Sequence, residues 1–149
     1  MVDLSMLDWL LFAVVNTVNI LTLLIFLARV KSPHLTRPLG IAAVAMAIPA
    51  IVLARLSFSA GRTWPYYVMP LIFTAWAVFA LVFDLIRKTE FRQPRNPKIL
   101  VPFLLLFYIG LVGMGILTWR IGLVYWLITA ITFALQLSGA AYASRHGKG

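Results

Sequence analysis

Residues 99–118 read ILVPFLLLFYIGLVGMGILT, a stretch of 20 residues without a charged side chain. An α-helix needs about 20 predominantly apolar residues to cross the ~30 Å hydrocarbon core of a bilayer. Four further stretches have similar length and composition, at 6–28, 39–56, 66–86 and 121–143. The sequence therefore predicts an all-α integral membrane protein, in which five transmembrane helices form one bundle and one transmembrane domain over residues 1–149.

The composition of the whole chain agrees with this class. Of its 149 residues 62% are hydrophobic and 11% are charged, and the mean hydropathy is +0.96. The absence of cysteine excludes disulfides, thiolate nucleophiles and thiolate metal sites. The two histidines, His34 and His146, lie in hydrophilic stretches, which excludes a pair of haem ligands inside the bilayer. We expect neither a metal site nor a cofactor.

The basic residues are distributed unevenly over the connections between the five stretches. One side of the membrane receives ten lysines and arginines, and the other receives three, Arg55, Arg62 and Arg120. Because cytoplasmic loops carry the excess of basic residues, we expect a multi-pass protein of the cell membrane with its N-terminus outside and its C-terminus in the cytoplasm. The net charge of +9 then predicts anionic lipid headgroups as partners rather than nucleic acid. We expect these headgroups at the basic residues around the third connection, Arg87, Lys88, Arg92, Arg95 and Lys98.

Two of the five stretches carry polar residues along a single face, at about 100° per residue. Polar side chains within a transmembrane helix usually face protein or water, so we expect these two faces to lie opposite each other or to line a shared cavity. The pattern leaves open whether they form hydrogen bonds between helices or a pathway for a ligand. The polar positions are Ser5, Asp8, Asn16, Asn19 and Thr22 in the first stretch and Tyr125, Thr129, Thr132 and Gln136 in the fifth.

Aromatic residues gather at the predicted outer ends of the helices, where they indicate either an interfacial belt or a ligand-facing cluster. If the first two helices adjoin, Asp8 and Arg55 lie at the same depth and form an ion pair that gates or lines the cavity. Pro49 and Pro70 each remove a backbone donor, so we expect both to kink their helices. The aromatic residues concerned are Trp9, Trp64, Tyr66, Tyr67, Trp119, Tyr125 and Trp126.

The sequence favours binding over catalysis. It contains no catalytic motif, and its four carboxylates are dispersed along the chain. The central parts of the predicted helices lack ionisable residues, which argues against proton-coupled transport. We therefore predict a protein that binds, or passively passes, a small neutral or amphipathic ligand through a polar-lined cavity between the first, third and fifth helices.

Two alternatives remain open. The first is an accessory or structural subunit of a membrane complex. The second, less favoured, is a lipid-modifying enzyme built on Asp8 or His34. A homo-oligomer or a membrane-protein partner is compatible with the sequence. No catalytic residue is assigned. The residues predicted to bind the ligand are Asp8, Asn16, Asn19, Arg55, Trp64, Tyr67, Thr74, Tyr125, Trp126, Thr129, Thr132 and Gln136.

Overall fold

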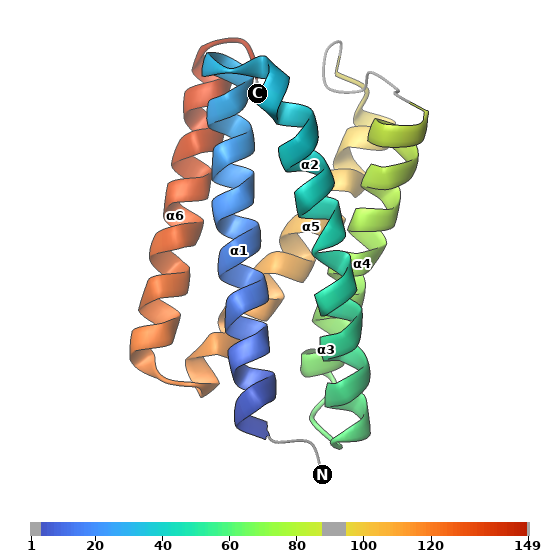
Figure 1. Ribbon diagram of the computed structural model, residues 1–149, viewed down its shortest axis with the longest axis vertical. Coiled ribbons are helices and arrows are strands. Elements are labelled where there is room, and N and C mark those ends of the chain that lie inside the picture. Colours follow the sequence, from blue (N-terminus) through green and yellow to red (C-terminus); the bar gives the residue numbers. More distant parts are fainter. Residues whose placement is uncertain (1–3, 88–94, 149) are drawn as a thin grey trace.

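The computed structural model of the protein describes residues 4–87 and 95–148. Within these residues all regular secondary structure is helical, which confirms the predicted all-α class. Five of the described helical segments are long and apolar enough to cross a membrane, and they run side by side as an up-and-down bundle (Figure 1). Their bounds are Leu4–Lys31, Pro33–Ser59, Pro65–Ile86, Pro97–Arg120 and Leu123–Arg145.

The first and last segments are uninterrupted α-helices, and the middle three contain irregular turns. The second consists of a 3-10 turn η1 and two α-helices, and the third ends in a π-helical segment, η2. The fourth ends in a 3-10 turn, η3. The elements are α1 (Leu4–Lys31), η1 (Pro33–Leu35), α2 (Thr36–Ala45), α3 (Ala47–Ser59), α4 (Pro65–Ala80), η2 (Leu81–Ile86), α5 (Pro97–Leu117), η3 (Thr118–Arg120) and α6 (Leu123–Arg145).

Proline and glycine set most of the helix boundaries. Pro33, Pro65 and Pro97 each open a helical segment, where the missing N–H has no partner to lose. The second segment therefore begins at Pro33 rather than near residue 39 as predicted. Gly61, with a φ of 65°, and Gly122, with a φ of 155°, form the tight turns before α4 and α6.

The break between α2 and α3 follows from Pro49. Without an N–H, Pro49 cannot bond the carbonyl oxygen of Ala45, and α2 ends at Ala45. Met46 forms a turn, with its N–H directed to the carbonyl oxygen of Ala43 at 3.3 Å. Pro70 also lies inside its helix, but α4 runs through it without a break. The expected interruption is therefore seen at Pro49.

The bundle has two ends, which differ in the elements that meet there (Figure 1). The N-terminal end holds the start of α1, the turn between α3 and α4, and the turn between η3 and α6. The C-terminal end holds the end of α6, the connection from α1 to α2, the end of η2 and the start of α5. All five segments thus run from one end to the other in alternating direction.

The helices pack chiefly as neighbouring pairs: α1 with α6, α3 with α4, and α4 with α5. Leu7, Leu11 and Val14 of α1 form the core with Phe73 of α4 and Met114 of α5. Helix α5 crosses obliquely behind α1 (Figure 1). It approaches α4 so closely that a Cβ on Gly110 would lie 2.7 Å from the backbone nitrogen of Phe73. This crossing leaves α5 and α1 further apart towards the C-terminal end, where a pocket lies between them.

Candidate functional site

The polar faces of α1 and α6 meet directly. Asn16 Nδ2 donates to Thr129 Oγ1 at 3.1 Å, and Thr132 Oγ1 donates to Asn16 Oδ1 at 2.7 Å. One turn along, Asn19 Nδ2 donates to Thr132 Oγ1 at 2.9 Å. The prediction that the two faces lie opposite each other is confirmed. These side chains thus form hydrogen bonds from one helix to the other, as expected for contacts between transmembrane helices.

Gln136 extends this polar seam, which we define as Asn16, Asn19, Thr129, Thr132 and Gln136. Gln136 is fully buried, and both its Nε2 and its Oε1 lack a hydrogen-bond partner among the residues that the structure describes. The Oδ1 of Asn19 likewise lacks a hydrogen-bond partner among the described residues. A buried polar group without a partner costs about 1–3 kcal/mol. The seam therefore has a bonded part around Asn16 and an unbonded part around Gln136.

The ion pair at the N-terminal end corrects one prediction. Asp8 pairs with Arg62, whose Nη1 lies 2.6 Å from Asp8 Oδ1, and not with Arg55. Arg62 Nη2 also donates to the carbonyl oxygen of Leu4 at 2.9 Å, and its guanidinium lies 4.5 Å from the Tyr66 ring centroid. Arg62 thus ties the start of α1 to the turn before α4.

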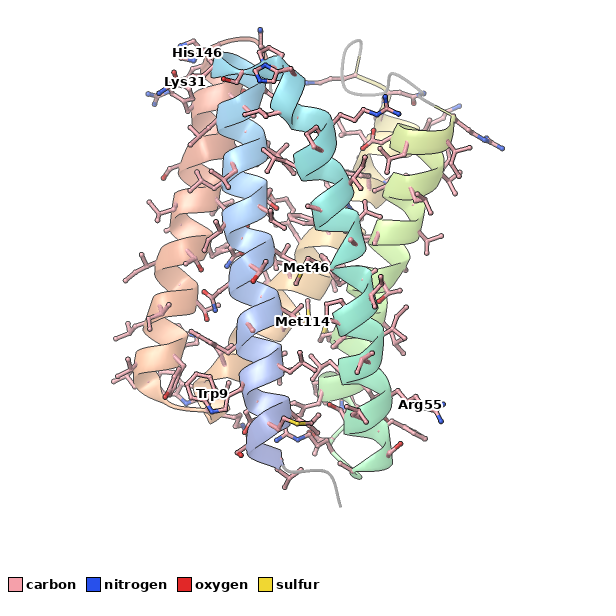
Figure 2. The ribbon with its side chains drawn as sticks, in the orientation of Figure 1. Trp9, Lys31, Met46, Arg55, Met114 and His146 are labelled. Carbon is pink, nitrogen blue, oxygen red and sulfur yellow. The ribbon has the colours of Figure 1, made fainter. Side chains whose placement is uncertain are left out.

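Arg55 is exposed and points outward from α3 (Figure 2). Its neighbours Leu53 and Ala54 occupy the buried face of that helix. Depth along the helix was the argument for pairing Asp8 with Arg55, but depth does not determine the direction in which a side chain points. Arg62 lies in the turn beyond the helix and reaches back to α1.

The aromatic residues at the N-terminal end form separate groups on the surface. The ring centroids of Trp9 and Tyr125 lie 5.1 Å apart, between α1 and α6. Those of Trp119 and Trp126 lie 5.3 Å apart. On the other side of the bundle, Tyr67 of α4 contacts Phe58 of α3, with 5.4 Å between centroids.

Trp64 and Thr74, two further residues predicted to bind the ligand, do not extend these aromatic groups. Trp64 is 59% exposed. The Oγ1 of Thr74 donates to the carbonyl oxygen of Pro70 in its own helix, at 2.9 Å. The aromatic residues of this end therefore do not form one ligand-facing cluster, and of the two predicted alternatives the arrangement favours the interfacial belt.

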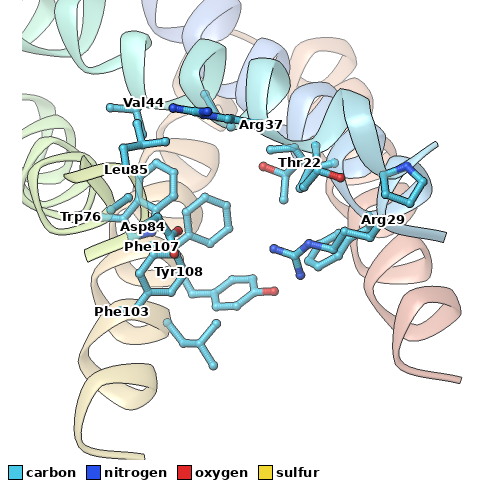
Figure 3. Close-up of a pocket in the computed structure, with 18 residues that line it drawn as sticks. Thr22, Arg29, Arg37, Val44, Trp76, Asp84, Leu85, Phe103, Phe107 and Tyr108 are labelled. Atoms are coloured by element: carbon cyan, nitrogen blue, oxygen red, sulfur yellow. The ribbon is translucent and has the colours of Figure 1, made fainter. Parts of the chain in front are cut away.

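A pocket lies at the opposite, C-terminal end of the bundle (Figure 3). It has a volume of about 360 Å³ and is walled by α1, the η1–α2 segment, α4 with η2, and α5. None of the residues predicted to bind a ligand lines it. Three charged residues and a group of aromatic rings do: Arg29, Arg37, Asp84, Trp76, Phe103 and Phe107.

The polarity of the pocket wall changes along the bundle axis. On α1, Arg29 lies seven residues, or about 10 Å, nearer the C-terminal end than Thr22. On α2, Arg37 lies seven residues nearer that end than Val44. On the segment formed by α4 and η2, Asp84 lies eight residues nearer it than Trp76. Three walls therefore place a charged residue near the end of the bundle and an apolar or weakly polar one deeper inside.

The deep part of the pocket is aromatic. The ring centroid of Trp76 lies 4.7 Å from that of Phe107 and 5.8 Å from that of Phe103. Trp76 is 7% exposed, and its Nε1 has no hydrogen-bond partner among the described residues. Thr36 Oγ1, nearer the C-terminal end of the bundle, also lacks a hydrogen-bond partner within the described part of the chain. The pocket therefore combines an apolar, aromatic floor with a charged rim.

The sequence contained part of this signal. Trp76 and Ala80 on one stretch, and Phe103 and Phe107 on the next, are each one helical turn apart. The spacing within one helix is readable from sequence, but which helices adjoin is not. The π-helical segment η2, which carries Asp84, was not predicted either. π-helical turns are frequent at functional sites.

The described residues contain no group of three or more acidic, cysteine or histidine side chains that could hold a metal ion. Comparisons of the chain with protein-family models, with curated proteins and with solved structures gave no match. The function must therefore be argued from the pocket itself.

Proposed function

We propose that this chain is a multi-pass integral membrane protein that binds a small amphipathic molecule in the pocket between α1, α2, α4 and α5. The surface of the bundle supports a lipid environment. Large apolar side chains in the middle of the helical segments are exposed, among them Ile48 at 68%, Ile131 at 59% and Val78 at 55%. Contiguous apolar surface of this kind is normally covered by lipid or another protein.

The basic residues support an orientation with the pocket in the cytoplasmic half. Three arginines, Arg55, Arg62 and Arg120, belong to the N-terminal end. The described basic residues of the other end are Arg29, Lys31, Arg37, Arg87, Arg95, Lys98, Arg145 and Lys148. By the positive-inside rule, the C-terminal end of the bundle faces the cytoplasm. The membrane of this proposal is the cell membrane.

Lipid headgroup contacts around the third connection stay part of this proposal. Arg87, Arg95 and Lys98 belong to the described part of the C-terminal end, and Lys88 and Arg92 lie outside the described residues. Juxtamembrane basic residues of this kind attract anionic lipids, at about 1 kcal/mol each.

The observation that carries the proposal is the coincidence of size and polarity in the pocket. Small-molecule sites commonly measure about 300–1,000 Å³ and are mostly apolar with a few placed polar groups. The pocket has about 360 Å³, an aromatic floor and a charged rim. An amphipathic molecule matches this gradient, whereas a uniformly polar solute would leave the aromatic wall without a partner. We therefore place the ligand here rather than in the predicted cavity between the first, third and fifth helices.

Gly40 provides a direct test, because it lines the pocket and a Cβ added to it meets no atom within 4 Å. Gly40→Phe should therefore place its Cβ without a clash and direct its ring into the pocket from α2. Ile41→Phe is the matched control, since Ile41 is exposed and does not line the pocket. The reporter is Trp76, in a variant whose other four tryptophans, all at the N-terminal end, are replaced by phenylalanine.

Quenching of Trp76 by a bromine-labelled dodecyl amphiphile, measured in lipid nanodiscs, reports binding. We expect saturable quenching in the reporter protein and with Ile41→Phe, and its loss with Gly40→Phe. Quenching that never saturates and is equal in all three proteins would show simple partitioning into the lipid and would contradict the proposal. A stoichiometric partner protein on purification, with no quenching, would favour the accessory-subunit alternative instead.

A further inference from the structure

Basic residues outnumber acidic residues around the pocket. Among the described residues that line it, two are arginines and one is an aspartate, a net charge of +1. Charges beside low-dielectric walls act more strongly than the same charges in open water. The rim therefore favours a ligand group of negative charge.

The two arginines come from different elements, which both face the pocket. Arg29 belongs to α1 and Arg37 to α2. The guanidinium of Arg29 lies 5.3 Å from the ring centroid of Phe26, which also lines the pocket. In Figure 3, Arg29 and Tyr108 point toward one another across the pocket, and Asp84 lies on the opposite side from Arg29. The two basic residues of the pocket lining thus belong to α1 and α2, and the acidic residue belongs to η2.

Guanidinium groups recognise particular anions. Their planar arrangement of N–H donors matches the oxygens of a carboxylate or a phosphate, and such charge-assisted bonds are stronger than neutral ones. Below the arginines, about 10 Å deeper along the helices, the wall is aromatic and apolar. A single molecule that fits both regions has an anionic head and an apolar tail.

We infer that the ligand is an amphipathic anion, whose carboxylate or phosphate head is held by Arg29 and Arg37 while its apolar tail lies against Trp76, Phe103 and Phe107. This inference rests on the proposed function, because it names the chemistry of the ligand bound at the same site. The anion enters with its head towards the C-terminal end of the bundle. That orientation matches a monoacyl lipid or fatty acid in the leaflet on that side.

The test measures displacement of the brominated amphiphile from the Trp76 reporter by four competitors with the same dodecyl chain. Dodecanoate and dodecyl phosphate carry the two anionic heads, dodecanol is neutral, and dodecyltrimethylammonium is cationic. We expect the anions to compete about tenfold or more better than dodecanol, and the cation least well. The ratio between dodecanoate and dodecyl phosphate identifies which head the site prefers.

Substitutions at the rim separate charge from fold. Arg29→Gln and Arg37→Gln should each weaken competition by the anions about tenfold and leave competition by dodecanol unchanged, which shows that the pocket is intact. Asp84→Asn should strengthen binding of the anions. Arg55→Gln, exposed at the opposite end, is the matched control and should change nothing.

The possible failures are distinguishable. If dodecanol competes as well as dodecanoate, and the rim substitutions have no effect, the inferred anion is wrong while saturable binding still supports the pocket. If dodecyltrimethylammonium competes best and Asp84→Asn abolishes this, the ligand is a cation. If Gly40→Phe leaves quenching unchanged, the proposed function itself fails.

Discussion

Gly110 should be the position where the packing of α4 on α5 is least tolerant. A Cβ at this position would lie 2.7 Å from the backbone nitrogen of Phe73 and 2.9 Å from its Cα. Ordinary contacts begin at 3.4 Å, so the two helices must separate by about 0.7 Å to accept Gly110→Ala. Backbone atoms cannot turn aside as a flexible side chain does. The change therefore acts on the whole crossing.

The expected size follows from two opposing terms. Overpacking costs about 1–3 kcal/mol, and replacing glycine by alanine within a helix gains about 1 kcal/mol. The two terms together lower the free energy of unfolding of Gly110→Ala by up to about 2 kcal/mol. Gly115→Ala is the matched control, because its Cβ would lie 3.5 Å from a methyl group of Thr129, an ordinary contact. That variant should be neutral or stabilised by up to about 1 kcal/mol.

Unfolding by sodium dodecyl sulfate, followed by tryptophan fluorescence in mixed micelles, compares these variants. The wild type and both substitutions are titrated at one protein concentration. If Gly110→Ala and Gly115→Ala shift the transition equally, the close approach of α5 to Phe73 is wrong. A stabilised Gly110→Ala would refute the packing argument outright.

Two further predictions concern the polar contacts of α1. Arg62→Gln should lower the free energy of unfolding by about 1–3 kcal/mol, because it leaves the partly buried Asp8 without its partner, whereas Arg55→Gln should leave it unchanged in the same detergent titration. Asn16→Leu should lower stability by about 1 kcal/mol through lost bonds to α6, while Gln136→Leu should leave it unchanged or raise it. A larger loss for Gln136→Leu than for Asn16→Leu would show that the unbonded part of the seam is the important one.

The sequence determined those parts of the fold that depend on one helix at a time. Uninterrupted apolar length predicted the five helices, and the spacing of Asn16 and Asn19 identified the face of α1 that meets α6. This worked because a helix fixes the angle between its own residues. The break after Ala45 was likewise foreseeable from Pro49, since the missing N–H acts within the same helix.

The sequence failed where two elements had to be placed relative to each other. Asp8 finds Arg62 because a turn residue reaches back to α1, which spacing along α3 could not reveal. The pocket depends on the oblique crossing of α5, set by the approach of Gly110 to Phe73. Arg29, Trp76 and Phe107 line one pocket although they belong to three different helices, α1, α4 and α5. Deep polar residues predicted to bind a ligand form hydrogen bonds between α1 and α6.

The most direct test of the pocket is photo-crosslinking with a fatty acid that carries a diazirine in its tail, followed by mass-spectrometric mapping of the labelled residues. We expect saturable labelling of Trp76, Phe103 and Phe107, competed by unlabelled dodecanoate and absent in Gly40→Phe. Labelling confined to outward-facing positions such as Ile48, Val124 and Ile131, unaffected by competitor or by Gly40→Phe, would contradict a ligand in this pocket.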